Sequence, residues 1–226
     1  MKKLLQLEMQ KNNFRQIVIG GALASGVLLI YLIFFALLTN QDCPDYISFF
    51  DDVLAFNKIV FTLFAGFLII KMFSDEINSK SISILFTYPL DRKHLLVVKV
   101  VLILMITTPL MFCSMLVHFI VLTIVNALFG FIQGSLSMSF VITYILAGLV
   151  HSILASLAAL IPIFIDVKFA SSQMTLITSA VMAVFLYSFP GNSLFGAGVI
   201  FGVIAAVAGV VLARLAIDIA SEMDIM

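Results

Sequence analysis

Charge is scarce in this sequence. Only 11% of its 226 residues are Asp, Glu, Lys or Arg, while 63% are hydrophobic. Typical soluble chains carry about a quarter charged residues, and the mean hydropathy here is +1.23, so most of the chain belongs in lipid. Its apolar runs are too long for barrel strands and lack strict alternation, and lipid requires every backbone polar group to be satisfied internally. The sequence therefore predicts an all-α membrane protein.

Motifs for catalysis, nucleotide hydrolysis and metal binding are also missing. There is no HExxH, no GxSxG and no pair of glutamates within an apolar run. A phosphate-binding loop requires a Gly-Lys pair, and the chain has none. Cys43 and Cys113 have neither CxxC spacing nor nearby histidines, and no basic patch would bind nucleic acid. We expect no enzyme activity, no metal site and no cofactor in this chain.

Six apolar runs approach or exceed the roughly 20 residues that cross a bilayer. They are Ile17–Leu38, Val53–Phe73, Leu95–Val125, Phe140–Ile165, Met174–Phe189 and Leu194–Leu215. The first is longer than the apolar region of a signal peptide and lacks a cleavage site, so we expect it to be retained. The fifth is short and ends in a Phe-Pro-Gly turn, so segment 174–194 is either a full span or part of a re-entrant hairpin. The prediction is one polytopic bundle of about six spans, residues 1–226.

The distribution of basic residues orients these spans. Lys and Arg are frequent before the first run, in loop 74–94, in loop 166–173 and near the C-terminus, whereas the opposite side carries only Lys58 among several aspartates. The positive-inside rule therefore places both termini and these two loops in the cytoplasm. Residues 1–16 mix leucines with lysines and suit an amphipathic N-terminal interfacial helix. A basic tail that only fixes topology is the alternative.

Few ionisable residues fall within the apolar runs, where they are costly. Lys58 lies near the outer end of its run and is expected to reach the interface by snorkelling. His118 and His151 lie well inside. His151, with Ser152 and Ser156, is a candidate for a translocation path; alternatively, the histidine bonds a neighbouring helix and the serines allow close packing.

The cytoplasmic segment between the second and third runs is the most informative. It contains the acidic pair Asp75-Glu76, apolar residues between Ile82 and Phe86, a helix-breaking Pro89, and Arg92. This pattern predicts a small amphipathic helix beneath the membrane that presents an apolar ridge to a partner protein. An ordinary short loop whose charges enforce topology is the alternative.

This segment resembles the type-2, export-type permease subunits of ABC transporters. Their pattern is Glu, a few residues, Gly-Thr, an apolar stretch, Pro, an apolar residue, Ser or Thr, Arg, and later Gly-Lys. The chain matches it at Glu76, Pro89, Arg92 and Lys99, with Ser81 where Thr is usual. It departs from the pattern at Lys80, Asp91 and Val98. Chain length, span number and orientation agree with the family over the rest of the chain.

The resemblance implies a permease subunit of an ATP-driven exporter in a bacterial-type cell membrane, moving an amphipathic or hydrophobic peptide, lipid or drug. Its partners would be a second permease copy, identical or different, and a separate ATP-binding subunit that holds ATP and Mg. Loop 74–94 would be the coupling helix, and loop 166–173, with Asp166 and Lys168, a second contact. The implied coupling residues are Glu76, Ser81, Leu85, Pro89, Arg92 and Lys99. Glu76 is a candidate to pair with Arg92 or Lys80.

Two other functions fit the composition. A substrate-binding subunit of a vitamin importer would need a polar pocket near the outer face, for which the chain offers only loop 39–52 and the polar run 132–139. A standalone immunity, scaffold or assembly protein would need no ATPase at all. Binding of an ATPase subunit separates these functions from the permease.

Overall fold

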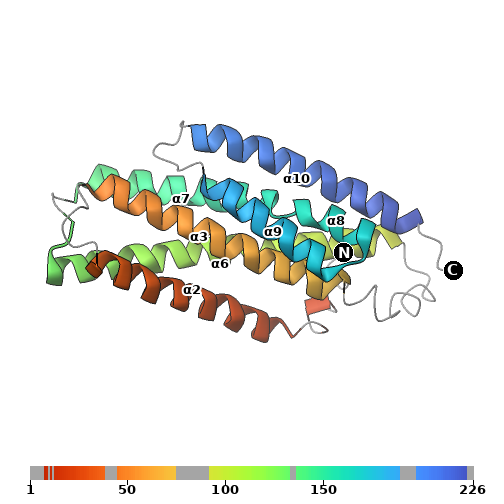
Figure 1. The fold of residues 1–226 in the computed structure, drawn as a ribbon, viewed down its shortest axis with the longest axis horizontal. Helices are drawn as coiled ribbons and strands as arrows, with labels where there is room; N and C mark the ends of the chain where they lie inside the picture. Colours follow the sequence, from red (N-terminus) through yellow and green to blue (C-terminus); the bar gives the residue numbers. More distant parts are fainter. Residues whose placement is uncertain are drawn as a thin grey trace.

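The computed structural model describes residues 8–9, 11, 13–38, 45–74, 92–132, 136–188 and 197–222, which form long helices running side by side along one direction (Figure 1). No strand occurs in these ranges. The helices are α2 (Phe14–Leu38), α3 (Tyr46–Ile69), α6 (Arg92–Phe129), α7 (Met138–Ala158), α8 (Ile161–Phe169), α9 (Ser172–Tyr187) and α10 (Ala197–Glu222). A π-helical turn, η1 (Ile70–Ser74), continues α3.

Five helical segments in the described part of the chain are long and apolar enough to cross a membrane. They are Phe14–Leu38, Tyr46–Phe73, Lys93–Phe129, Met138–Phe169 and Gly198–Ala220. Helix α9 is also apolar but has only 16 residues, about 24 Å at 1.5 Å per residue, less than the roughly 30 Å of a bilayer core. The predicted polytopic helical bundle is confirmed, with a sixth helix that is shorter than the others.

Successive long helices alternate in direction, so that α2 begins and α10 ends at the same end of the bundle (Figure 1). Basic residues gather at this end, among them Arg15, Lys71, Lys93, Lys168 and Arg214. The other end carries Asp45, Asp51 and Asp52. We call the end where α2 begins and α10 ends the cytoplasmic end, as the positive-inside rule predicts, and the opposite end the outer end.

Most of the predicted N-terminal interfacial helix lies outside the described residues. Glu8, Met9 and Lys11 are helical, and Asn13 has a positive φ of 47° immediately before α2. Asparagine tolerates this left-handed conformation better than most residues. Met9 packs against the apolar core at the cytoplasmic end, so this short piece folds back onto the bundle.

The predicted fourth run, Phe140–Ile165, is not one continuous helix. It is divided into α7 and α8 at Ala159–Leu160, because Pro162 lacks the N–H that would donate to the carbonyl of Ala158. The break is closed by a hydrogen bond from Leu160 N to Leu157 O at 3.2 Å. Gly209 of α10 lies directly against the Leu157 carbonyl, where a Cβ atom would have no room.

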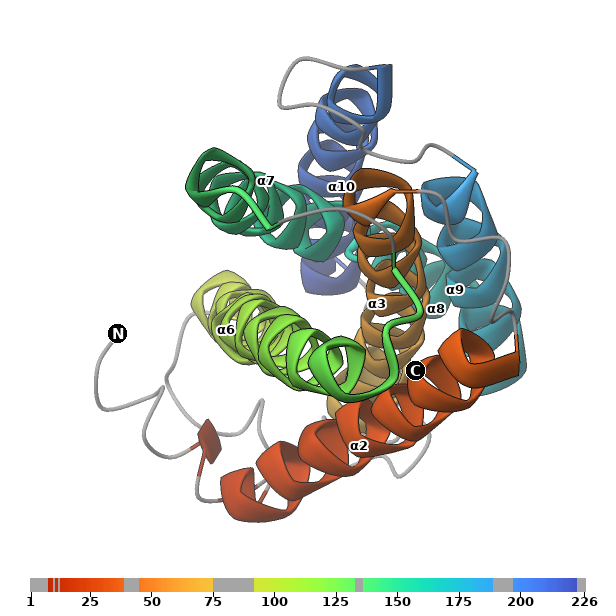
Figure 2. The same ribbon diagram turned by 90° about the vertical axis from the view of Figure 1, so that its left-hand side faces the viewer.

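Helix α3 occupies the centre of the bundle (Figure 2). It contacts α2, α6, α7 and α9, and 61% of its most apolar window is buried, against 22% for α2 and 33% for α10. Gly66 allows its close approach to Ser179 of α9, since a side chain there would collide with the serine. Helices α2 and α10 lie at the periphery and expose apolar side chains suited to lipid, such as Leu23, Ile30, Ile204 and Val211.

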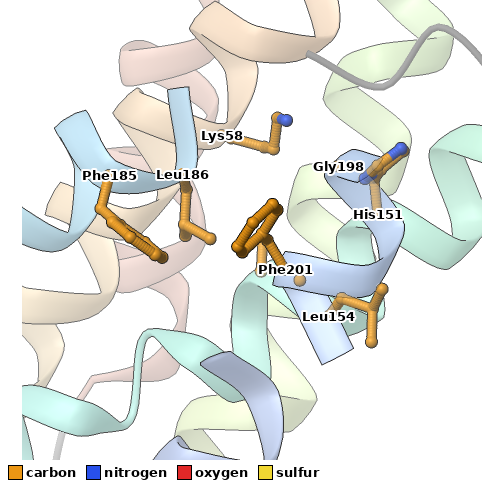
Figure 3. Close-up of a pocket in the computed structure, with 9 residues that line it drawn as sticks. Lys58, His151, Leu154, Phe185, Leu186, Gly198 and Phe201 are labelled. Atoms are coloured by element: carbon orange, nitrogen blue, oxygen red, sulfur yellow. The ribbon is translucent and has the colours of Figure 1, made fainter. Parts of the chain in front are cut away.

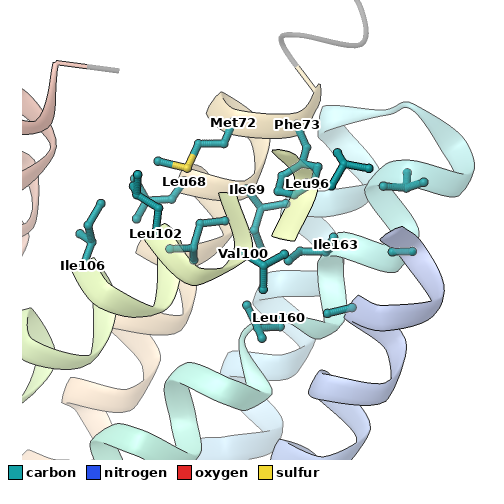
Figure 4. Close-up of a cluster of buried hydrophobic side chains, with 14 of the residues drawn as sticks. Leu68, Ile69, Met72, Phe73, Leu96, Val100, Leu102, Ile106, Leu160 and Ile163 are labelled. Carbon is teal, nitrogen blue, oxygen red and sulfur yellow. The ribbon is translucent and has the colours of Figure 1, made fainter. Parts of the chain in front are cut away.

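Two apolar clusters hold the ends of the bundle together. At the cytoplasmic end, Met72 and Phe73 of η1 pack with Leu96 and Val100 of α6 and Ile163 of α8 (Figure 4). At the outer end, the cluster is largely aromatic. Its ring centroids lie 4.8 Å apart for Phe50–Phe119 and 5.2 Å apart for Phe50–Tyr144, which joins α3 to α6 and α7.

Candidate coupling and transport sites

Most of the predicted coupling loop lies outside the described residues. The part that is not described contains Glu76, Ser81, Leu85 and Pro89, so the predicted pairing of Glu76 with Arg92 or Lys80 also lies outside the described residues. Its two ends are described. The incoming chain leaves the bundle after η1 at Ser74, and the outgoing chain begins α6 at Arg92.

Lys99 joins these two ends of the loop. Its side chain is 2% exposed, its Nζ donates a hydrogen bond to Met72 O at 2.9 Å, and the ammonium group lies 5.6 Å from the centroid of the Phe73 ring. The last carbonyls of a helix have no partner within the helix, and a cation there also interacts favourably with the helix dipole. Lys99 therefore fixes α6 to the end of η1 from inside the bundle and positions both ends of loop 74–94.

A second link at the cytoplasmic face joins α6 to α10. Lys93 Nζ donates to Asp218 Oδ1 at 2.9 Å, and both side chains are about half exposed. This pair was not predictable from the sequence, because 125 positions separate the two residues. Exposed ion pairs contribute little to stability. This contact therefore affects the orientation of the two helix ends more than the stability of the fold.

Of the two residues predicted for the second cytoplasmic contact, one is buried and the other is exposed. Asp166 is fully buried and accepts a hydrogen bond from Thr175 Oγ1 at 2.5 Å, which holds α8 to α9. Between these helices Ala170 adopts a left-handed conformation with φ 46° and donates its N–H to Asp166 O. Lys168 is exposed and lies over the rings of Phe164 and Phe169. Of the two predicted residues, Lys168 reaches the surface where a partner would bind.

The three residues predicted for a translocation path make different contacts. Ser152 Oγ donates to Gly148 O at 2.7 Å within α7, and Ser156 Oγ lies 2.7 Å from Thr108 Oγ1 of α6. Ser156 therefore links two helices, whereas the bond of Ser152 stays within one, and their place in a translocation path stays a prediction. His151 is 3% exposed, and its Nε2 has no hydrogen-bond partner in the described part of the chain. His151 lies on the wall of a pocket.

This pocket lies between α3, α7, α9 and α10 (Figure 3). Its polar lining consists of Lys58 and His151. Its apolar lining consists of Leu154, Ala155, Phe185, Leu186, Gly198, Phe201 and Gly202. We call this set of residues the Lys58 pocket. It lies where α9 ends and α10 begins, while α3 and α7 continue past it towards the outer end (Figure 1).

The predicted snorkelling of Lys58 to the interface is wrong. The residue lies twelve positions into α3, about 18 Å from the outer end of that helix. Its side chain turns into the bundle, where it is only 4% exposed. The hydropathy of the run did not reveal this, because the face on which a lysine lies depends on which helices surround it.

A second polar cluster lies on another face of α3. Asn57 Nδ2 donates to Met111 O at 3.0 Å, and Ser114 Oγ donates to Asn57 Oδ1 at 3.1 Å. Ser25 Oγ lies 2.8 Å from Ser114 Oγ, and His118 Nε2 lies 3.1 Å from Ser25 O. Together these groups connect α2, α3 and α6 at the level of the membrane. Only His118 stood out in the sequence, because the other members are small neutral residues common in any helix.

Comparison with known proteins places this architecture. Residues 4–191 match the profile of the family described as ABC-2 family transporter protein. The uncharacterized protein YcbO of Bacillus subtilis (strain 168) is 26% identical over 200 residues, which cover 84% of this chain and 86% of that protein. No solved structure matches the chain.

The family profile spans both ends of loop 74–94, the whole of loop 166–173 and the Lys58 pocket as far as α9. It therefore covers the segment in which the resemblance to ABC permeases was found and most of the helical bundle around it. This chain belongs to the ABC-2 family of transporter proteins and is a multi-pass membrane transport subunit.

Proposed function

We propose that this chain is the permease subunit of an ATP-driven ABC exporter in a bacterial-type cell membrane. Family membership is the observation that carries the proposal. The chain has no Gly-Lys pair and so lacks the phosphate-binding loop of ATPases. A separate ATP-binding subunit therefore holds ATP and Mg, and a second permease copy, identical or different, completes the membrane part.

The cytoplasmic end of the bundle suits transmission of a movement from such an ATPase. Loop 74–94 connects central helix α3, through η1, to α6, and Lys99 fixes the two ends of the loop to each other. A shift of the docked loop would therefore move α3 and α6 as a pair, in the way that rigid elements carry conformational changes. Lys168 provides a second exposed contact at the same end.

The cargo proposed for this exporter is amphipathic or hydrophobic, in the class of small peptides, lipids or drugs. The interior supports this class because isolated polar groups lie among aromatic and aliphatic side chains, as in the Lys58 pocket. Such a lining suits a molecule with one polar end and a larger apolar part.

Substitutions in the coupling loop test the permease function. We expect Glu76→Gln and Arg92→Gln each to abolish ATP-dependent transport of labelled amphiphiles into inverted membrane vesicles, while the ATPase continues to hydrolyse ATP. Lys11→Gln, a change of another cytoplasmic-side residue outside the loop, should leave transport unchanged. Transport at the wild-type rate in both loop variants would refute the assigned coupling role.

The same preparation separates the alternatives. A substrate-binding subunit of a vitamin importer would accumulate a vitamin in the direction of the cytoplasm. A standalone immunity or scaffold protein would show neither transport nor bound ATPase. The match to a transporter family over residues 4–191 favours the permease over both.

A further inference from the structure

The Lys58 pocket contains a buried cation in a part of the bundle where charge is costly. Charged side chains inside membrane proteins are rare, and when they occur they mark pathways for substrates or ions. Lys58 is 4% exposed on the central helix α3, and His151 is 3% exposed on α7. Packing alone does not require either residue, since an apolar side chain of similar volume would fill the same space without a desolvation cost.

The groups that line the pocket favour an anion. Among the described residues that line it, the two polar side chains are Lys58 and His151, whose nitrogens can donate hydrogen bonds, and none is a carboxylate. Asp51, two helical turns towards the outer end of α3, interacts electrostatically with Lys58. His151 Nε2 has no hydrogen-bond partner in the described residues and lies on the pocket wall (Figure 3). Charged nitrogen donors in an apolar surrounding form strong hydrogen bonds to carboxylate or phosphate oxygens.

The size and the apolar lining of the Lys58 pocket restrict which ligands bind in it. The free space is on the scale of one water molecule, so it takes about one oxygen atom of a charged group, and the rest of the bound molecule lies outside this space. Phe185, Leu186 and Phe201 surround this space with apolar surface from α9 and α10. Gly202 lets α10 approach α7 closely beside the pocket, because an added Cβ would lie only 3.2 Å from Leu154 Cδ1.

We infer that Lys58 and His151 bind the carboxylate or phosphate group of an amphipathic cargo, whose apolar part lies against the ends of α9 and α10. This inference rests on the proposed transport function and narrows its cargo to an amphipathic anion. Asp51 competes with the cargo for Lys58, so cargo binding exchanges one negative partner of the lysine for another.

Binding of defined amphiphiles to the purified full chain in phosphatidylcholine nanodiscs tests the inference. The probes are laurate, which carries a carboxylate, dodecyl phosphate, which carries a phosphate, and dodecyltrimethylammonium, which has a similar chain and the opposite charge. We expect saturable binding of at least one anionic probe and none of the cation. The comparison between the two anions shows which headgroup chemistry the pocket prefers.

Variants assign this binding to the pocket. Lys58→Met should weaken anion binding by about tenfold or more, the usual effect of losing a charged hydrogen-bond partner, and Lys58→Arg should retain most of it. Asp51→Asn should strengthen binding, because it removes the competing carboxylate. Lys11→Met, a change of an exposed lysine near the N-terminus, is the matched control. Equal affinity in wild type and Lys58→Met, or no saturable binding of either anion to wild type, would overturn the inference.

A measurement on the wild-type chain keeps the test valid if Lys58→Met fails to fold. A fatty acid with a diazirine near its carboxylate should, after illumination, label peptides that contain residues 185–186 or 198–202. Labelling spread over the lipid-facing side of α2 would contradict the site. Either failure would leave the proposed permease function standing if the chain still co-purifies with an ATPase, so the two proposals are tested separately.

Discussion

Small buried polar residues connect the helices of this bundle, and Asn57 makes two such contacts near its centre. Its side chain is fully buried and bonds both Met111 O and Ser114 Oγ of α6. Asn57→Ala would leave the serine without that partner, and we expect a loss of about 1–2 kcal/mol. The loss would appear as a lower unfolding temperature by circular dichroism in detergent. Thr143→Ala, an exposed change on α7, should leave that temperature unaltered.

Two cytoplasmic lysines on α6 make contrasting predictions. Lys99 is buried against the end of η1, so Lys99→Met should destabilise the chain by about 1–2 kcal/mol through the unsatisfied carbonyl of Met72. Lys93 lies on the surface, so Lys93→Met should have little effect on thermal unfolding. If Lys99→Met unfolds at the wild-type temperature, its contact with Met72 O does not hold the loop ends together.

Lys58 and Lys99 show that the sequence alone does not predict the burial and the contacts of a single residue. Lys58 was predicted to lie near the outer end of its run, and Lys99 was predicted as part of the permease pattern. Their burial and partners depend on tertiary packing, which hydropathy does not encode. To predict the burial of Lys58, one would have to know that α9 and α10 pack beside that face of α3.

At the scale of elements, the contact between α10 and the break in α7–α8 gives a sharp test. Gly209→Ala places a methyl group on the Leu157 carbonyl, and overpacking of this kind costs about 1–3 kcal/mol. Gly26→Ala on α2 meets nothing within 4 Å and is the matched control. Alanine favours helix by up to about 1 kcal/mol over glycine, so the control should be neutral or stabilising. Equal melting temperatures for the two variants would contradict the close approach at Gly209.

The helices themselves were largely predictable from hydrophobic runs. The apolar segments placed every long helix, because a bilayer requires long uninterrupted apolar stretches. The runs did not show the break at Ala159–Leu160, although Pro162 was a readable signal for it. The π-helical turn at Ile70–Ser74 had no comparable signal in the sequence.

For the whole molecule, the orientation follows from charge and is testable by labelling. In a background with Cys43→Ser and Cys113→Ser, Lys168→Cys should react with a membrane-impermeant maleimide only in inverted vesicles. Asp45→Cys, exposed at the outer end, should react in intact cells. The reverse pattern would invert the assigned topology.

Family membership was predictable from a few loop residues, whereas the site was predicted only in part. Glu76, Pro89 and Arg92 carried the resemblance that the family profile confirms, yet the arrangement of that loop lies outside the described residues. Ser152 and Ser156 stay candidate path residues, and in the structure they bond Gly148 O and Thr108 Oγ1. His151 belongs to a pocket whose other polar member, Lys58, comes from a helix about ninety positions away.

Co-purification tests the central claim most directly. The tagged chain should be extracted gently from its native membrane, its partners identified by mass spectrometry, and the preparation assayed for ATP hydrolysis. The proposed function predicts a stoichiometric ATP-binding subunit that is lost when residues 76–92 are altered. A chain that purifies alone from several detergents and in nanodiscs, with no ATPase activity, would contradict the permease function and favour a standalone membrane protein.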